Sequence, residues 1–228
     1  MNKRSDDSEL FSYYNERASE YEEFYSGRTG ARIHDPELYT RETLTIRRLL
    51  SELVYGKCLD MACGTGFWLP VYEKNCGHIT LIDQSENVLA ECNEKVNLLG
   101  IKDKVEIIQD NVFEYDFPKK TYDSVLAGFF ISHFKDSELK RFFHLINALL
   151  VSGGRLVIID SNWNEETANS DRTKSGIISR TLSNGRKFEV YKRYFEQDDI
   201  NKMSEKYGFT TTFIFWGKVF FLVSSVFS

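Results

Sequence analysis

Cysteine is scarce in this chain, and its cysteines lack the spacing of a metal site. No C-x-x-C pair occurs and no close pair of histidines accompanies the thiols, so a structural zinc site is disfavoured. A disulfide framework requires an oxidising compartment, and the polar residues 1–7 do not have the pattern of a signal peptide. We therefore expect a cytoplasmic protein with no bound metal and with reduced, mostly buried thiols at Cys58, Cys63, Cys76 and Cys92.

Long apolar runs and an excess of basic charge are also absent. The most apolar segment, residues 213–227, is cut by Gly217 and Lys218 into halves of strand length, which are too short to span a bilayer. A formal net charge of −5 argues against a general nucleic-acid or anionic-membrane binder, although a local basic patch is compatible with it. We expect no membrane or nucleic-acid partner, and either a monomer or a homodimer.

What the chain does have is the composition of a globular domain. Apolar residues make up 42% and aromatic residues 14% of the 228 residues, which is ample for one domain with a sizeable core. In the middle of the chain, short apolar strands alternate with helical patterns, and this demands a parallel sheet with right-handed crossovers. The predicted strands cover residues 57–61, 79–83, 105–109, 122–127 and 155–160, and the predicted helices cover residues 66–75, 86–99 and 136–150.

Both ends of the chain depart from this alternation. Apolar residues at helical spacing predict an amphipathic helix over residues 9–25 and a second helix that opens at Pro36. Toward the C-terminus, Asn184-Gly185 predicts the turn of a β-hairpin formed by residues 177–182 and 186–193. A helix over residues 197–207 precedes two strands, residues 209–216 and 218–227, which a link as short as Gly217 makes antiparallel.

The most informative stretch is a short strand that runs into a glycine turn, Cys58-Leu-Asp-Met-Ala-Cys-Gly-Thr-Gly-Phe-Trp68. Glycine suits the turn because it adopts φ values closed to other residues and leaves room for a ligand. Asp83 ends the next strand, roughly 20 residues on, where α/β folds place an acid on a ribose hydroxyl. Together these features predict a nucleoside-binding site at the edge of the sheet.

The turn differs from two other nucleotide sites. A dinucleotide fingerprint needs a third glycine where Leu69 stands, and a phosphate-binding loop needs a Gly-Lys-Ser/Thr run that is missing here. Asp60, just before the turn, would repel a pyrophosphate but suits the cationic end of a ligand. An adenosine cofactor with a positive charge and no phosphate fits this pattern best.

At this point the sequence resembles the class I, Rossmann-like S-adenosylmethionine-dependent methyltransferases of the small-molecule type. Five runs carry the likeness: Leu59-Asp-Met-Ala-Cys-Gly-Thr-Gly66, Leu81-Ile-Asp83, Ile108-Gln-Asp110-Asn-Val, Tyr122-Asp-Ser-Val-Leu-Ala-Gly-Phe129 and Leu150-Val-Ser-Gly-Gly-Arg-Leu156. The resemblance covers roughly residues 10–227. It implies an α/β three-layer sandwich with a seven-stranded, mostly parallel sheet, an antiparallel last strand, an N-terminal helical lid and a β-hairpin insertion.

The resemblance also implies a cofactor, S-adenosyl-L-methionine, and the residues that contact it. Core packing competes with cofactor contact as the interpretation for Trp68, Phe129 and the tyrosines, and loop capping competes with it for Asp110. His133 lies at the expected mouth of the site, where a neutral imidazole can act as a general base. The implied cofactor contacts are Tyr14, Tyr21, Asp60, Ala62, Gly64, Gly66, Trp68, Asp83, Gln84, Asp110, Asn111, Val112 and Phe129.

We expect one domain in four parts: a lid (residues 1–55), a cofactor-binding core (56–160), an acceptor-side insertion (161–195) and a C-terminal helix with a strand pair (196–228). The expected activity is methyl transfer to a small-molecule acceptor by in-line displacement. Several arginines are candidates for steering an anionic acceptor, although a solvated surface is their default: Arg28, Arg32, Arg172, Arg180 and Arg186.

Other functions share the same cofactor residues. A non-catalytic S-adenosylmethionine-binding regulatory or partner subunit remains open, and so does a protein or RNA methyltransferase. A nicotinamide oxidoreductase is disfavoured by Leu69 and Asp60. No Asn/Asp-Pro-Pro-aromatic run follows the fourth strand, which argues against methylation of amino groups on bases.

Overall fold

The structure, a computed structural model, describes residues 5–20, 22, 35–166 and 173–227. Its α-helices are α1 (Ser5–Arg17), α3 (Pro36–Leu50), α4 (Leu69–Tyr72), α5 (Glu86–Leu99), α6 (Asp136–Leu149) and α7 (Gln197–Tyr207). Its 3₁₀ turns are η1 (Ala18–Glu20), η2 (Glu73–Asn75), η3 (Lys102–Lys104) and η4 (Ile131–His133). Its strands are β1 (Gly56–Met61), β2 (Cys76–Asp83), β3 (Val105–Gln109), β4 (Tyr122–Gly128), β5 (Leu150–Ser161), β6 (Ser175–Thr181), β7 (Lys187–Arg193), β8 (Phe209–Trp216) and β9 (Phe220–Phe227).

The main sheet has seven strands in the order β3-β2-β1-β4-β5-β9-β8. Strands β3, β2, β1, β4 and β5 pair in parallel, while β9 runs antiparallel to both of its neighbours, β5 and β8. The predicted fold class is therefore confirmed. The carboxyl ends of the parallel strands all meet at one edge of this sheet, which is where α/β folds place their ligands.

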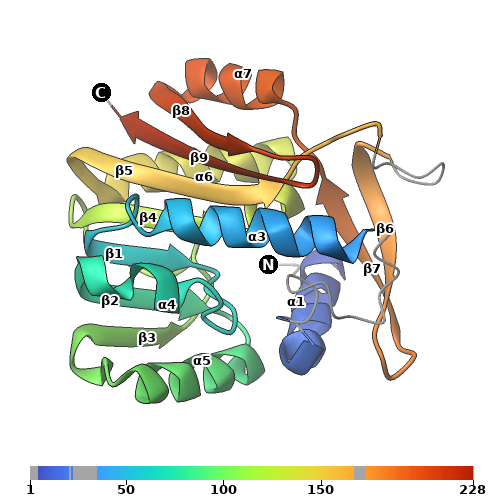
Figure 1. Ribbon diagram of the computed structural model, residues 1–228, viewed down its shortest axis with the longest axis horizontal. Coiled ribbons are helices and arrows are strands. Elements are labelled where there is room, and N and C mark those ends of the chain that lie inside the picture. The colour runs from blue at the N-terminus through green and yellow to red at the C-terminus, as the bar shows by residue number, and fades with distance from the viewer. Residues whose placement is uncertain (1–4, 21, 23–34, 167–172, 228) are drawn as a thin grey trace.

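Helices cover both faces of the sheet and form three layers (Figure 1). Successive residues of a strand belong to opposite cores, as Cys58 and Leu59 in β1 illustrate. Helices α3, α4 and α5 pack on the face of Cys58, and α6 and α7 pack on the face of Leu59. The four thiols are unpaired and buried, as the sequence predicts.

Two elements lie beyond the carboxyl edge of the sheet: helix α1 and the separate two-stranded sheet β6–β7 (Figure 1). They share a small apolar cluster made by Tyr13 from α1 and by Leu182, Phe188 and Val190 from the hairpin. This position makes α1 and the hairpin a cover for the edge at which the parallel strands end. None of the helices in the described ranges has the length and apolar character that crossing a bilayer requires.

Several predicted boundaries were wrong; strand β2, for example, begins at Cys76 rather than at residue 79. The helix predicted from residue 66 begins only at Leu69, because Gly66 has φ +69° and belongs to the turn. Strand β5 begins at Leu150 rather than at residue 155, because Leu150 pairs with Tyr122 and Gly153, at φ +73°, bends the strand instead of ending it. Helix α1 ends at Arg17 and continues as a 3₁₀ turn.

Polar side chains and a glycine cap helices α5 and α3. Ser85 precedes α5, and its hydroxyl accepts a hydrogen bond from the backbone N–H of Val88 at 3.4 Å. Gly100 follows α5 with φ +67°, the left-handed conformation that ends many helices. Asp35 caps α3 through the N–H of Leu38 at 2.9 Å. These caps fix where α5 begins, directly after the carboxyl end of β2.

Candidate active site

The glycine turn after β1 holds three alternate residues in the left-handed region of backbone conformation. The φ angles are +51° at Ala62, +54° at Gly64 and +69° at Gly66. The N–H of Cys63 donates to the carbonyl of Ile82 at 3.1 Å, which ties the turn to β2. A Cβ built on Gly66 would lie 2.8 Å from Sγ of the buried Cys92. Glycine at residue 66 is therefore required both by conformation and by space.

Asp83 ends β2 and joins the glycine turn to the start of α5. Its Oδ2 accepts the N–H of Gly64 at 3.0 Å, and its Oδ1 accepts the N–H of Ser85 at 3.0 Å. Burial raises the pKa of Asp83, and the surrounding backbone N–H groups oppose that shift. An ionised carboxylate accepts about four hydrogen bonds, so acceptor capacity remains for a hydroxyl group of a ligand.

Asp60 lies one strand away and is almost fully buried, with 2% of its surface exposed. Its Oδ2 accepts the hydroxyl of Tyr72 at 2.7 Å. Burial is the largest cause that raises the pKa of Asp60 to about 7; Tyr72 lowers it and the nearby charge of Asp83 raises it. A carboxyl group with this pKa is half ionised at neutral pH, and a positive charge placed beside it would ionise it fully.

The third acid lies on the loop after β3. The N–H of Asp110 donates to the carbonyl of Asp83 at 3.1 Å, so the loops after β2 and β3 touch at this edge. The side chain of Asp110 is exposed and accepts the N–H of Asn111 at 2.6 Å. Asn111 in turn accepts the N–H of Phe113 at 2.9 Å. Both side chains shape this loop, and their contact with a cofactor stays a prediction.

Two of the predicted contact residues, Val112 and Gln84, differ in how their side chains are placed. The side chain of Val112 is buried in the core on the α6 face, so only its backbone is free to meet a ligand. Gln84 is exposed, and its carbonyl accepts Nε2 of Gln109 at 3.5 Å. Tyr21 lies outside the described residues, as do Arg28, Arg32 and Arg172.

Trp68 and Phe129 form one aromatic wall of the site. Their rings are stacked with centroids 6.1 Å apart and planes 27° apart, and both side chains are buried. Phe129 has φ +55°, which is uncommon for an aromatic residue, and its N–H donates to the carbonyl of Ile159 at 2.7 Å. Core packing and a role at the site are compatible here, because Phe129 follows β4 at the ligand edge.

His133, in η4 after β4, is held by hydrogen bonds at both ring nitrogens. Nδ1 lies 2.9 Å from the carbonyl oxygen of Tyr191, which can only accept, so Nδ1 carries the proton. Nε2 therefore accepts the hydroxyl of Tyr14, at 2.7 Å. Burial is the largest cause that lowers the pKa of His133 to about 3, followed by the charge of Lys192. The imidazole is neutral, and its lone pair is already engaged by the lid helix.

Sequence reasoning missed the buried network beside His133. Asp160, at the end of β5, accepts the N–H groups of Ser132 at 3.0 Å and of Ser161 at 2.7 Å. Lys192 of β7 donates to Ser132 Oγ at 2.6 Å and lies 3.3 Å from Asp160 Oδ1. The sequence does show Asp160 as an acid directly after the apolar run of β5, and this position could have indicated a functional or structural role. The partner on β7 was not readable, because it depends on how the hairpin docks.

The close approach at Gly66 gives a first testable prediction. Gly66→Ala should lower the free energy of unfolding by about 2 kcal/mol, because alanine must adopt the left-handed conformation and also crowd Cys92. Gly100→Ala is the matched control: φ is +67° there, but nothing lies within 4 Å of an added Cβ, and we expect a loss of about 1 kcal/mol. Urea unfolding measures both. Equal losses would contradict the tight packing of the turn.

The chemistry of this site can be compared with the ligand that the sequence implies. Two carboxyl groups, Asp60 and Asp83, flank the turn. The cations that reach the turn, Lys95 and Arg47, donate to backbone carbonyls, of Thr65 at 2.9 Å and of Phe67 at 3.2 Å. Acids at this position disfavour a pyrophosphate and suit a nucleoside with hydroxyl groups and positive charge. The residues therefore fit S-adenosylmethionine.

Comparison with known proteins agrees with this geometry. Residues 58–154 match a family model described as a methyltransferase domain. A phosphatidylethanolamine N-methyltransferase of Cereibacter sphaeroides is 34% identical over 105 residues, which are 46% of this chain and 50% of the relative. A demethylmenaquinone methyltransferase of Listeria monocytogenes is 30% identical over 127 residues, 54% of this chain and 51% of the relative. The chain thus spans about half the length of the curated relatives it matches.

Solved structures match over nearly the whole chain. The DhpI–SAM–HEP complex aligns with a TM-score of 0.77 at 22% identity and covers 99% of each chain. An S-adenosylmethionine-dependent methyltransferase from Clostridium acetobutylicum ATCC 824 aligns with a TM-score of 0.62 at 17% identity, over 95% of this chain and 100% of that one. With the sheet order, these likenesses show that the chain has the fold of class I S-adenosylmethionine-dependent methyltransferases, and residues 58–154 match a methyltransferase domain.

Proposed function

We propose that this chain transfers the methyl group of S-adenosylmethionine to a small-molecule acceptor that binds beneath α1 and the β6–β7 hairpin. The observation that carries the proposal is the closure of the ligand edge: one helix is clamped at the same time to the cofactor side and to the hairpin. Small-molecule and lipid acceptors in the names of the curated relatives support the same class of substrate.

The first half of the clamp joins α1 to the hairpin. The carboxylate of Glu9 accepts the N–H of Glu189 at 2.7 Å, and Glu16 forms an ion pair with Arg186. Between these polar contacts, the rings of Tyr13 and Phe188 pack with centroids 5.6 Å apart. Polar contacts at both ends and an aromatic contact between them hold the helix against the hairpin along its length.

The second half of the clamp joins the N-terminal segment to the cofactor side. Ser85 Oγ donates to Asn15 Oδ1 at 2.8 Å, and the side-chain amide of Asn87 donates to the carbonyl of Asn15 at 3.0 Å. Further on, Glu22 accepts the hydroxyl of Thr65, in the glycine turn, at 2.9 Å. A macromolecular acceptor would have to displace these contacts, whereas a small molecule can be enclosed by them. Enclosure also excludes water from the reacting groups.

Within this site the residues have separable roles. Asp83 would accept hydrogen bonds from the ribose hydroxyls, and the glycine turn would admit the ligand close to the backbone. When bound, S-adenosylmethionine supplies a methyl group that its sulfonium charge has already activated, so the protein mainly orients the acceptor and excludes water. His133 and Tyr14 form the polar pair on the acceptor side. Any proton that leaves the acceptor would pass to this pair.

The pKa of Asp60 leads to a prediction about proton release. S-adenosylmethionine brings positive charge, which favours the ionised carboxylate, so binding at pH 7 should release about half a proton from Asp60. The affinity should therefore increase as the pH rises from about 6 to 8. Calorimetry in two buffers with different ionisation enthalpies measures the released protons. The amino group of the ligand also titrates, so the number of protons released by the wild type is compared with the number released by Asp60→Asn. Equal proton release by the two proteins would remove Asp60 from the site.

His133 gives a second prediction about the reaction. His133→Ala should slow turnover on the true acceptor about ten-fold, because the variant loses the Nε2 lone pair that would receive the proton. We expect no larger effect, because in the wild type this lone pair already accepts the hydroxyl of Tyr14. Tyr14→Phe removes only the hydroxyl and should leave the imidazole able to act directly. Single-turnover rates at saturating cofactor measure both variants. Unchanged rates in His133→Ala would refute the role of general base.

The proposed function is tested by a metabolite screen with methyl-labelled cofactor, read by mass spectrometry. Label in a small-molecule fraction supports the proposal. Cofactor binding with label only in protein or RNA would contradict the assigned acceptor class. Binding without transfer to any fraction would instead support a non-catalytic S-adenosylmethionine-binding subunit.

A further inference from the structure

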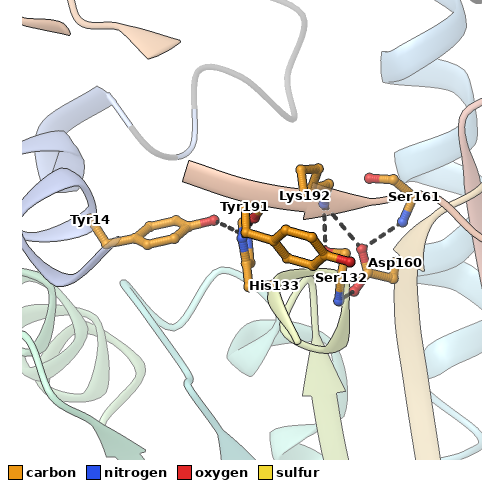
Figure 2. Close-up of polar contacts among 7 residues, drawn as sticks. All are labelled: Tyr14, Ser132, His133, Asp160, Ser161, Tyr191 and Lys192. Atoms are coloured by element: carbon orange, nitrogen blue, oxygen red, sulfur yellow. Dashed lines mark hydrogen bonds and ion pairs between the residues drawn. The ribbon is translucent and has the colours of Figure 1, made fainter. Parts of the chain in front are cut away.

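The described structure brings the lid, the loop after β4 and the hairpin together at one polar cluster (Figure 2). Tyr14 reaches His133 from α1, and the carbonyl of Tyr191 holds the other side of the imidazole. Lys192, the next residue on β7, turns toward Ser132 and Asp160. Two adjacent residues of the hairpin thus contact both η4 and the end of β5. The cluster lies on the acceptor side of the proposed active site.

Lys192 is a buried cation, and its charge is balanced locally. Only 7% of its surface is exposed, and Asp160 beside it is fully buried. The lysine fills the third position around the Asp160 carboxylate, whose other partners are the N–H groups of Ser132 and Ser161. This network anchors the hairpin to the sheet. Asp160 therefore balances the charge of Lys192 and does not balance the charges of the other cations of the hairpin.

Arg180 lies on the same inward face of the hairpin. It pairs with Phe188 across the two strands, and residues 188, 190 and 192 alternate inward and are buried. The side chain of Arg180 is half-buried, and no residue that the structure describes forms a hydrogen bond or an ion pair with its guanidinium. A half-buried guanidinium on an inward face, with five donors unused within the described structure, is costly to desolvate without an anion.

Positive charge from two elements faces His133. Besides burial, the charges of Lys192, Arg180 and Arg17 all lower the pKa of His133. Arg17 belongs to α1, one turn after Tyr13 and Tyr14, and is only 9% exposed. Four carboxylates that contact the hairpin bind other partners on it: Glu16 pairs with Arg186, Asp136 pairs with Arg193, and Glu9 and Glu20 accept the backbone N–H groups of Glu189 and Ser183. The acceptor side is therefore basic, although the whole chain has a net charge of −5.

We propose that the acceptor carries an oxyanion, a carboxylate or a phosphate-type group, and that Arg180 binds it at the junction of α1 and the hairpin, beside His133. This inference rests on the proposed function, since it names the class of substrate that enters the same site. Arg180 binds a planar carboxylate or a tetrahedral oxyanion in a bidentate manner, which fixes the orientation of the rest of the acceptor. The bound negative charge would also offset the surrounding cations and make His133 a stronger base.

The test uses the full chain saturated with S-adenosylhomocysteine, at constant ionic strength. Calorimetric titrations with inorganic phosphate, methylphosphonate and acetate, and with neutral acetamide, measure binding to the wild type, Arg180→Gln and Lys187→Gln. Lys187 is the matched control because it is a cation of the same hairpin whose side chain is exposed. We expect saturable binding of at least one anion to the wild type and to Lys187→Gln, weakened ten-fold or more in Arg180→Gln. The anion that binds with the higher affinity, phosphate-type or acetate, identifies the class of oxyanion.

Two results would overturn the inference. The first is the absence of anion binding to a protein that binds S-adenosylhomocysteine normally, which leaves the proposed function intact. The second is equal anion affinity in Arg180→Gln and Lys187→Gln, which would place the anion elsewhere on the surface. Failure of S-adenosylhomocysteine itself to bind would be a different outcome, because it overturns the proposed function and the inference with it.

Discussion

Asp83→Ala is expected to raise the dissociation constant for S-adenosylmethionine about 30- to 150-fold. Hydrogen bonds to a charged group contribute about 2–3 kcal/mol at such a site, and each 1.4 kcal/mol is a factor of ten in affinity. The loss has two physical sources. The ribose hydroxyls lose their acceptor, and the N–H groups of Gly64 and Ser85 lose the carboxylate that positions the turn relative to α5.

Two further variants test the contribution of the charge and the specificity of the effect. Asp83→Asn keeps an oxygen and the shape of the side chain but loses the charge, so we expect an intermediate affinity. Asp103→Ala is the matched control, since Asp103 is an exposed acid in η3, which precedes β3 at the opposite edge of the sheet. Calorimetric titration with S-adenosylmethionine measures the affinities, and thermal unfolding checks that each variant is folded. An unchanged affinity in Asp83→Ala would remove the ribose assignment.

Asp160→Ala is expected to lower the free energy of unfolding by about 3–5 kcal/mol, the cost of leaving one charge of a buried pair without its partner. Lys192 would remain buried beside Ser132, and two backbone N–H groups would lose their acceptor. Since whole domains are stable by only 5–15 kcal/mol, this is a large fraction of the total. Urea unfolding at pH 7 is the measurement.

A neighbouring ion pair on the same strand provides the control. Arg193 pairs with Asp136 at 2.9 Å, but the side chain of Asp136 is 84% exposed. Asp136→Ala should therefore change the free energy of unfolding by less than about 1 kcal/mol. The double variant Asp160→Ala with Lys192→Met should cost less than the sum of the single variants, because it removes both charges. Additive losses would show that the pair is not coupled.

The sequence predicts the cofactor side of this site well, because it depends on local patterns. Asp60 and Asp83 lie at the carboxyl ends of apolar strands and Phe129 directly follows one, and the carboxyl ends of parallel strands must meet at one edge. The glycine turn follows from Gly64 and Gly66 alone. The structure adds Tyr72, which binds Asp60 and was read only as part of a helix.

The acceptor side could not be predicted in the same way. Tyr14 and His133 are 119 residues apart, and Lys192 and Asp160 come from different sheets. Their meeting depends on how α1 and the hairpin dock, and hydrophobic alternation specifies only which face of each is buried. Arg180 was named as a cation near an anionic acceptor, but only the register with Phe188 places it on the inward face.

The most direct test of the account is a crystal structure of the protein grown with saturating S-adenosylhomocysteine. We expect density for the nucleoside along the turn of Gly64 and Gly66, with the ribose hydroxyls bound to the Asp83 carboxylate. Density at any other place, or a turn left empty at saturation, would contradict it.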